Sequence, residues 1–211
     1  MHNVTVAFAV LLVMLLSYFF GCFNGSFMVS HFIIRDDVRK HGSGNAGLTN
    51  FYRTYGAKYA LLVIACDMGK TVAACLLGSF FFRCLGWDGT LGTLLAGLGC
   101  ELGHIFPVFY GFRGGKGILS GGTIVWMIDW RIGLVVWVGF LLLFLLTKYV
   151  SLGSVWAGAS FPFATWYFYP DPVIVLLAFL LGALILWKHR SNIVRLIHGN
   201  ENKFSVHRKK N

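Results

Sequence analysis

Charged side chains are scarce in this chain, because only 12% of its 211 residues are Asp, Glu, Lys or Arg. Soluble domains carry about 25% charged residues. None of these four residue types occurs before Arg35, and 57% of the chain is hydrophobic. The composition therefore excludes an ordinary soluble domain and predicts a polytopic membrane protein.

Motifs for metal binding and hydrolysis are also missing. The five cysteines show no C-x-x-C spacing and no H-E-x-x-H sequence occurs, so neither a disulfide set nor a metal site is indicated. The absence of G-x-S-x-G excludes a nucleophile elbow. We expect no metal and no organic cofactor. The first apolar run lacks a basic segment before it and is too long for a cleavable signal peptide.

Long apolar segments recur instead, and a spanning helix needs about 20 such residues. Gly117–Trp130 is short for a crossing, and Pro162 interrupts another segment. We expect an all-α membrane protein with about seven transmembrane helices in a single domain, residues 1–211. The predicted spans are Val4–Phe27, Tyr59–Phe82, Thr90–Tyr110, Gly117–Trp130, Ile132–Tyr149, Ser151–Tyr169 and Pro172–Trp187.

Positive charge is clustered, with a net charge of +10 gathered at 35–58 and from residue 188 onward. The positive-inside rule places both clusters in the cytoplasm, with the N-terminus outside and a short basic cytoplasmic tail from about residue 188. This orientation needs an odd number of crossings. Five crossings with two re-entrant segments is the alternative. Basic residues beside apolar spans indicate anionic lipid or phosphate ligands, and we expect no nucleic acid.

The first polar motif is Gly42-Ser43-Gly44-Asn45-Ala46-Gly47-Leu48-Thr49-Asn50, followed by Arg53. Its glycines allow tight turns and close approach of a ligand to the backbone. Backbone N–H groups, hydroxyls and amides then surround an anion, and a guanidinium suits phosphate oxygens. The alternative is an ordinary loop in which Ser and Asn serve as turn and cap residues.

The second motif is Gly103-His104-Ile105-Phe106-Pro107-Val108-Phe109, with Phe112-Arg113-Gly114-Gly115-Lys116-Gly117 after it. Although it is not a Walker A sequence, a glycine-rich loop with a lysine suits an anion. A flexible loop with a cytoplasmic lysine is the alternative. We favour an anion site, because this loop and the first motif are predicted on the same side of the membrane.

The third motif, His189-Arg190-Ser191-Asn192-Ile193-Val194-Arg195-Leu196, follows the last predicted span and precedes Gly199 and Glu201. His189 and Asn192 share a helix face. Taken alone, the motif is equally typical of a basic tail that stops transfer across the membrane.

Four ionisable residues lie inside predicted spans, where charge is costly. Asp67 and Lys70 are either functional or a neutralising structural pair. Glu101 either orients His104 or satisfies a buried imidazole. His31 and Asp36 match an H-x-x-x-x-D acyltransferase pattern, but Phe106-Pro107 does not continue as F-P-x-G, so we interpret this match as coincidence.

Together the three motifs resemble the PlsY family of acyl-phosphate:glycerol-3-phosphate acyltransferases. Asp67 and Lys70 resemble its D-x-x-K element, and the segment 149–154 resembles the one before its sixth span. The resemblance covers essentially the whole chain. Leu48, Glu101 and the run after Gly117 depart from the family pattern, which puts fine specificity in doubt more than reaction class.

The resemblance implies transfer of a fatty acyl group from acyl phosphate to glycerol 3-phosphate, giving 1-acylglycerol 3-phosphate and phosphate. It implies catalytic roles for Ser43, His189 and Asn192. His189 and His104 are the candidate general bases, and a substrate phosphate oxygen is the alternative. The implied substrate- or phosphate-binding residues are Gly42, Gly44, Asn45, Asn50, Arg53, Lys70, His104, Gly114, Gly115, Lys116, Gly117 and Ser154.

The resemblance also implies a multi-pass protein of the bacterial inner membrane with its site toward the cytoplasm. Its expected partners are the two substrates, the lipid bilayer and the enzyme that makes acyl phosphate. Acyl-CoA and acyl-carrier protein stay open as donors on spacing alone. The rival class, a transporter for a phosphorylated metabolite, predicts internal repeats, and none is visible. A lipid-binding scaffold gives no reason for paired phosphate loops.

Overall fold

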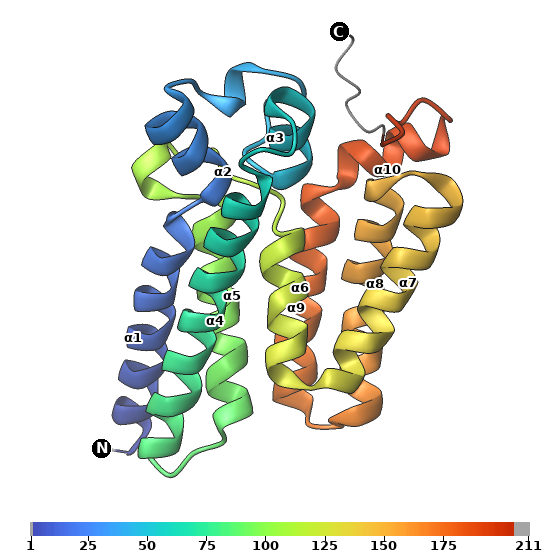
Figure 1. The fold of residues 1–211 in the computed structure, drawn as a ribbon. Coiled ribbons are helices and arrows are strands. Elements are labelled where there is room, and N and C mark those ends of the chain that lie inside the picture. Colours follow the sequence, from blue (N-terminus) through green and yellow to red (C-terminus); the bar gives the residue numbers. More distant parts are fainter. Residues whose placement is uncertain (1, 205–211) are drawn as a thin grey trace, which may run out of the picture.

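The computed structural model describes residues 2–204 and shows a bundle of long helices (Figure 1). Throughout this part of the chain the regular structure is helical, as predicted. The α-helices are α1 (His2–Cys22), α2 (Gly25–Met28), α3 (Leu48–Tyr55), α4 (Ala60–Cys84), α5 (Gly89–Ile105), α6 (Ile118–Ile128), α7 (Trp130–Thr147), α8 (Val150–Phe168), α9 (Pro172–Lys188) and α10 (Arg190–Ile197). A π-helical turn, Val29–Ile34, and two 3₁₀ turns, Val38–Lys40 and Val108–Tyr110, connect them.

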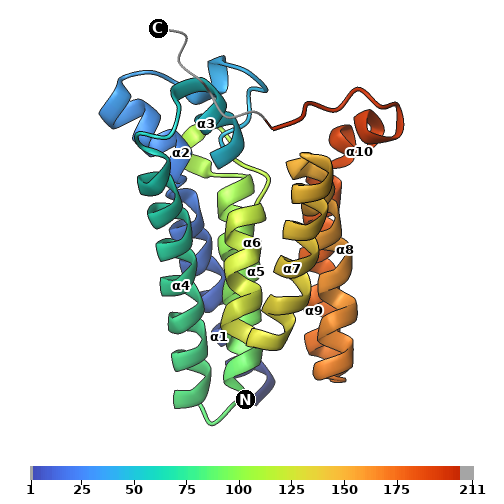
Figure 2. The same ribbon diagram turned by 45° about the vertical axis from the view of Figure 1, so that its right-hand side comes forward.

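Each predicted span contains one main helix, and these helices run side by side (Figures 1 and 2). By length and composition, 4 helices of the described residues are able to cross a membrane. The number rises to 5 if α9 and α10, which meet at 60°, form one bent span. With 11 residues, α6 is too short by this measure. The crossing number of seven therefore stays a prediction.

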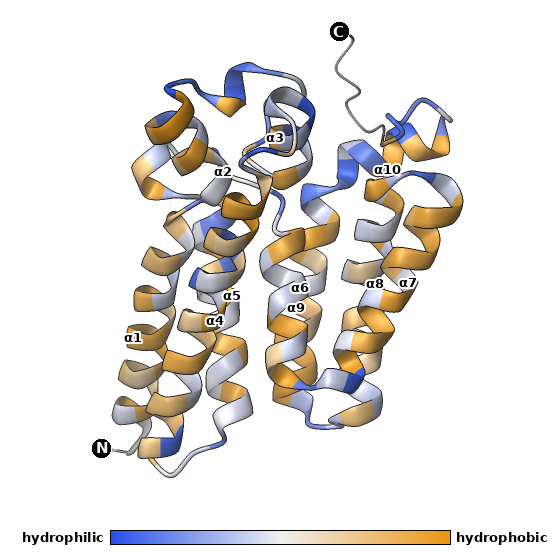
Figure 3. Ribbon diagram, in the orientation of Figure 1, coloured by the Kyte–Doolittle hydropathy of each residue, from blue (hydrophilic) through white to orange (hydrophobic). Residues whose placement is uncertain are grey.

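Polar segments gather at one end of the bundle (Figure 3). We call it the polar end; it comprises residues 35–58, 106–117, 148–150 and 189–204. At the opposite end, α5, α7 and α9 begin with aspartate caps. Asp88 accepts from the N–H of Thr90 at 2.8 Å, and Asp171 accepts from that of Val173 at 2.9 Å. The glycine-rich and basic motifs thus lie together, as the sequence predicts.

Small residues bring α5 close to α1 and α4. A Cβ on Gly99 would lie 2.5 Å from the carbonyl oxygen of Met14, and one on Gly103 would overlap that of Tyr18. Gly78 of α4 faces Gly92 in the same way. Such glycine contacts let membrane helices approach backbone to backbone. They hold the end of α5, which carries His104, in a fixed place.

The first predicted span is broken rather than continuous. α1 ends at Cys22, and Asn24 caps α2 by accepting from the N–H of Phe27 at 2.9 Å. A break leaves backbone groups without helical partners. Lys70 satisfies the carbonyls of Gly21 and Phe23 at 3.1 and 3.0 Å. The predicted first crossing is confirmed, because Val4–Ile34 is long and apolar enough to span a membrane. The break within it was not predicted, and buried polar side chains of α4 replace the missing helical bonds.

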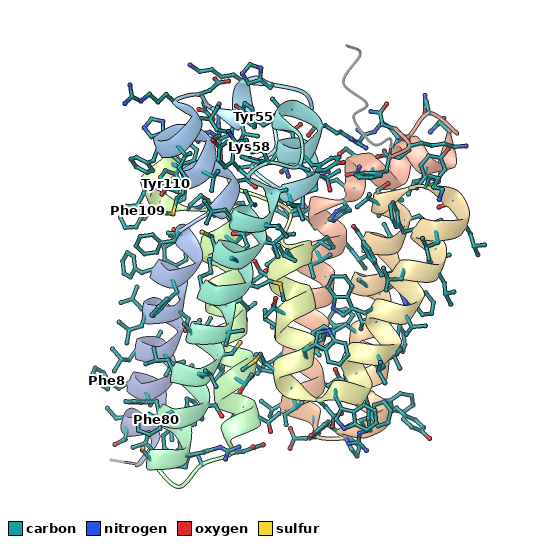
Figure 4. All side chains as sticks on the ribbon, viewed as in Figure 1. Phe8, Tyr55, Lys58, Phe80, Phe109 and Tyr110 are labelled. Atoms are coloured by element: carbon teal, nitrogen blue, oxygen red, sulfur yellow. The ribbon has the colours of Figure 1, made fainter. Side chains whose placement is uncertain are left out.

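Large apolar side chains cover the outside of the bundle between its ends (Figure 4). Phe8 of α1 and Phe80 of α4 are 65% and 68% exposed and point away from the neighbouring helices. Exposed apolar surface of this extent suits a lipid environment. The side chains of Tyr55 and Lys58 lie at the polar end.

Candidate active site

A cavity of about 520 Å³ lies at the polar end, where the three predicted motifs meet. It is bounded by residues of α3, of the loop before α6, and of α7, α8 and α10. The predicted site residues in its wall are Ser43, Asn45, Asn50, Arg53, His104, Lys116, Gly117, Ser154, His189 and Asn192. The predicted residues Gly42, Gly44, Lys70, Gly114 and Gly115 lie outside this wall.

Asn50 organises the first motif. Its Oδ1 accepts from the N–H of Ser43 at 2.9 Å, and its Nδ2 donates to the carbonyls of Val38, His41 and Asn45 at 3.0–3.1 Å. These contacts use the whole amide, so Asn50 shapes the loop. Gly44 has a φ of +69°, a backbone angle that residues other than glycine rarely adopt. The loop thereby presents Ser43 at the cavity.

A short segment that follows α10, residues 199–204, crosses the cavity from α10 toward α3; we call it the tail strap (Figure 2). Arg53 donates to the carbonyl of Asn202 at 3.3 Å. The N–H of Phe204 donates to the carbonyl of Lys148 at 2.8 Å, and its ring stacks on Tyr52 at 5.3 Å between centroids. Both Glu201 and Asn202 line the cavity.

The second motif folds back onto the end of α5. The N–H groups of Gly114 and Gly115 both donate at 3.1 Å, to the carbonyls of Ile105 and His104. A Cβ on Gly115 would overlap Nε2 of His104, and one on Gly117 would overlap the carboxyl group of Glu101. The glycines therefore allow the loop to lie directly on α5, which positions Lys116.

Lys116 is part of a charged group in the cavity wall, which we call the cavity network. Its Nζ donates to Oδ1 of Asn192, whose Nδ2 donates to Glu201 at 2.9 Å. Arg195 binds the same carboxylate at 2.7 Å. Burial first, and then the nearby Arg195, lower the pKa of Lys116 from 10.5 to about 8. The cavity wall thus holds three cations, Arg53, Lys116 and Arg195, and two carboxylates, Asp67 and Glu201, a balance that suits an anionic ligand.

A second group, Asp67, Lys70 and His104, is named the buried cluster; Asp67 and His104 border the cavity, and Lys70 lies outside its wall. Lys70 Nζ contacts Asp67 Oδ1 at 2.8 Å and His104 Nδ1 at 2.9 Å. Asp67 also accepts from the N–H of Gly25 at 3.0 Å. The ammonium group of Lys70 is thus fully engaged within the protein, and its predicted contact with substrate stays a prediction. The alternative of a structural pair has direct support.

The two candidate histidine bases differ in their hydrogen bonds. His189 Nδ1 lies 2.9 Å from the carbonyl of Ile185, a contact that requires a proton on Nδ1. Its Nε2 is then an acceptor, as a general base requires. His104 Nδ1 lies 2.9 Å from Lys70 Nζ, and because an ammonium group only donates, a hydrogen bond between these atoms requires the ring proton on Nε2. Asp67, at 3.5 Å, is the carboxylate beside His104, and not Glu101 as one hypothesis had it.

Several wall residues were not among the predicted site residues. Trp137 and Phe140 of α7 form an apolar side of the cavity. Ser151 lies near Ser154 in the wall, and its buried hydroxyl has no hydrogen-bond partner within residues 2–204. Glu201 was noted only as part of a resemblance. Each position depends on contacts between distant helices, and spacing along the chain does not report these.

The alternative acyltransferase dyad is not assembled. Asp36 pairs with His41 at 2.8 Å and accepts from Tyr55 at 3.0 Å, while His31 stacks on Phe27 at 5.2 Å between ring centroids. Neither His31 nor Asp36 lines the cavity. Across residues 2–204 no three side chains of the metal-binding types gather to hold an ion.

Residues 11–199 match the family model for glycerol-3-phosphate acyltransferase. The chain belongs to this family. A glycerol-3-phosphate acyltransferase of Finegoldia magna is 42% identical over 187 residues, covering 88% of this chain and 91% of that protein. One from Thermoanaerobacter pseudethanolicus is 36% identical over 189 residues, covering 90% of this chain and 92% of that protein. The resemblance to the PlsY family is thereby confirmed.

Two crystal structures of PlsY, an integral membrane glycerol 3-phosphate acyltransferase, share the fold. The glycerol 3-phosphate form is 32% identical with a TM-score of 0.83, covering 93% of this chain and 96% of that one. The lysophosphatidic acid form is 31% identical with a TM-score of 0.81 over the same shares. With its apolar helices, this member of the PlsY family is therefore an integral membrane protein.

Proposed function

We propose that this protein transfers a fatty acyl group from acyl phosphate to the 1-hydroxyl of glycerol 3-phosphate. The products are 1-acylglycerol 3-phosphate, which is lysophosphatidic acid, and inorganic phosphate. This is the first acylation step of phospholipid synthesis. The crystal structures of PlsY in glycerol 3-phosphate and lysophosphatidic acid forms support the acceptor and the product. The resemblance of the three motifs supports the donor.

One observation carries the proposal: a single cavity joins a cationic wall to an apolar one. Arg53, Lys116 and Arg195 lie on the first wall, and Trp137 and Phe140 lie on the second. Both proposed substrates carry a phosphate, and one carries a fatty chain. Guanidinium and ammonium groups bind phosphate oxygens strongly, and aromatic rings bury apolar chains. The cavity is thus suited to holding both substrates together.

The chemistry needs no covalent enzyme intermediate. The 1-hydroxyl oxygen attacks the acyl carbonyl carbon, and the carbon–oxygen bond to phosphate then breaks. The leaving phosphate keeps the electron pair. Positioning of the two reactants and stabilisation of the negative charge that develops on the carbonyl oxygen lower the barrier. Lys116 and the N–H groups of its loop are the proposed donors to that charge.

Two acceptors compete for the proton of the 1-hydroxyl. Nε2 of His189 is unprotonated when Nδ1 donates to Ile185, which favours this residue over His104 as a base. A substrate phosphate oxygen is the other acceptor. Replacing His189 with Gln separates them. Turnover reduced about a hundredfold at saturating substrates is expected for a base. Near-normal turnover would assign the proton to the substrate phosphate.

We assign the other residues by their place in the cavity. Ser43, His189 and Asn192 are the proposed catalytic residues. Arg53, Lys116, Asn45, Gly117 and Ser154 are proposed to contact substrate from the wall. The remaining predicted residues are proposed to support these contacts, Asn50 and His104 from within the wall and Gly42, Gly44, Lys70, Gly114 and Gly115 from outside it.

The proposed location is the bacterial cytoplasmic membrane, with the polar end toward the cytoplasm and the N-terminus outside. The basic residues of 35–58 and of the segment from 188 support this orientation. The soluble acceptor then enters from the cytoplasm, while the acyl donor arrives through the lipid. An enzyme that makes acyl phosphate is the proposed functional partner.

The deciding experiment measures phosphate release by the detergent-purified protein given palmitoyl phosphate and glycerol 3-phosphate. We expect release that needs both substrates and falls at least a hundredfold in a Ser43→Ala variant. Turnover with palmitoyl-CoA but not with palmitoyl phosphate would overturn the donor. No turnover with either donor, in protein shown to be folded, would favour a transporter.

A further inference from the structure

The deep end of the cavity is formed by the indole of Trp137. This residue lies ten positions before Thr147, the last residue of α7 at the polar end. At about 1.5 Å per helical residue, it is about 15 Å below that end. The other apolar wall residues lie closer to the polar end: Phe140 is one turn higher on α7, and Val150 begins α8. Trp137 is therefore the floor of the cavity.

The position of this indole is fixed from two sides. Its Nε1 donates to the carbonyl of Gly122 on α6 at 3.0 Å, and its ring lies 5.3 Å from that of Phe140 between centroids. A Cβ on Gly122 would lie 2.6 Å from the indole Cζ2 atom. Since real Cβ atoms do not approach so closely, the indole lies where it does because position 122 has no side chain.

More apolar space lies beyond the indole. A second cavity of about 10 Å³ is enclosed by α6, α7, α8 and α9 and shares Ile118 with the large cavity. Gly122, which binds the indole, also lines this second space. The indole and Gly122 therefore stand between the two spaces, and a smaller side chain at position 137 would extend the large cavity into the bundle.

We propose that Trp137 is a specificity-determining residue that sets the longest acyl chain the cavity holds, with Gly122 fixing the depth of that floor. The inference rests on the proposed function, because it takes a fatty acyl group as the cavity's apolar ligand. Each methylene buried in an apolar site raises affinity about fourfold. That gain ends where the chain meets the indole, so kcat/KM rises with chain length and then falls.

The test measures kcat/KM for lauroyl, myristoyl, palmitoyl, stearoyl and arachidoyl phosphate in lipid nanodiscs. The variants are Trp137→Ala, Trp137→Phe and Gly122→Ala, and the matched control is Trp166→Ala, on a lipid-facing side chain that is 64% exposed. Only the ratios between chain lengths within one variant are compared. Partial loss of folded protein leaves these ratios unchanged.

Substitutions at positions 137 and 122 are expected to shift the preferred acyl-chain length in opposite directions. Trp137→Ala should raise the ratio of the longest to the shortest donor at least about sixteenfold, by adding two or more accommodated methylenes at about fourfold each, with Trp137→Phe between it and wild type. Gly122→Ala should push the indole into the cavity and lower the same ratio about fourfold. Trp166→Ala should keep the wild-type profile.

An unchanged profile in both Trp137 variants would overturn the inference and show that the acyl chain leaves the cavity toward lipid before reaching α7. A change in the chain-length ratio in the same direction for the Trp137 and Gly122 variants would also overturn the inference, since that pattern reflects a general loosening of helix packing. If wild type turns over no acyl phosphate of any length, the proposed function fails instead. The two failures are thus distinguishable.

Discussion

The buried cluster and the cavity network are neighbours at the polar end, yet they use charge differently. In the buried cluster, the ammonium group of Lys70 has four acceptors within 3.1 Å, which are Gly21, Phe23, Asp67 and His104. An ammonium group has only three hydrogens to donate. Lys70 therefore has no N–H left to donate to a ligand.

The cavity network has the opposite balance. Glu201 is bonded to Asn192 and Arg195. Within residues 2–204, the one hydrogen-bond partner of Lys116 is the neutral amide of Asn192, and that of the Arg53 side chain is a backbone carbonyl. Lys116 and Arg53 therefore keep N–H groups that are able to donate to a ligand in the cavity. Intramembrane charge is therefore a poor guide to function by itself; unused hydrogen-bonding capacity beside a cavity is a better one.

The largest expected effect breaks the buried cluster. Asp67→Asn removes the carboxylate and leaves the ammonium group of Lys70 buried without a counter-ion, so we expect a loss of about 3–5 kcal/mol in unfolding free energy. Thermal unfolding of the purified protein in detergent measures it. Glu101→Gln is the matched control, because this carboxyl group is equally buried and has no hydrogen-bond partner in residues 2–204. Equal stability of the two variants would contradict a structural role for the cluster.

A smaller effect is expected from the cavity network, and it falls on activity rather than stability. Lys116→Met should lower kcat/KM about a hundredfold, since loss of a charged donor to a desolvated anion costs about 2–5 kcal/mol. Its melting temperature should match that of wild type. Lys40→Met, on an exposed lysine outside the cavity, is the control. A large fall in melting temperature for Lys116→Met would make Lys116 a second structural cation and remove the contrast.

The smallest effect is a pH dependence that sharpens the comparison. The pKa of Lys116 is lowered from 10.5 to about 8, so the empty site carries this charge below pH 8 and loses it above. At pH 9 the charged fraction is about one tenth, and KM for glycerol 3-phosphate should rise up to tenfold. The substrate phosphate, with a second pKa near 6, does not change over this range.

Lys116→Arg provides the control for that titration. Arginine stays protonated throughout, so the rise in KM between pH 8 and 9 should disappear in this variant. If KM for glycerol 3-phosphate still rises between pH 8 and 9 in Lys116→Arg, the pH dependence comes from another titratable group.

Sequence reasoning located the helices and the motifs because both depend on local pattern. Apolar length predicted a helix in every span, and the glycine-rich segments proved to bound one cavity. It did not predict the break after Cys22, which depends on Lys70, 49 positions away from Gly21 in the chain. It also left the two histidines equivalent, since their tautomers follow from Ile185 and Lys70.

The residues of the apolar cavity wall could not be predicted from the sequence for a related reason. Trp137 and Phe140 lie in a span where nearly every residue is apolar, so nothing along the chain separates a residue that faces the cavity from one that faces lipid. Only the packing of α6 against α7 makes that distinction.

The tail strap links this cavity to the order in which the chain is made. Arg53 and Asn202, which meet above the cavity, are separated by 149 positions, so the ribosome delivers one long before the other. A growing chain whose helices are already in the bilayer still lacks Glu201 and Asn202 from its cavity wall. A chain stopped before residue 201 would therefore insert its helices into the membrane without a complete cavity wall.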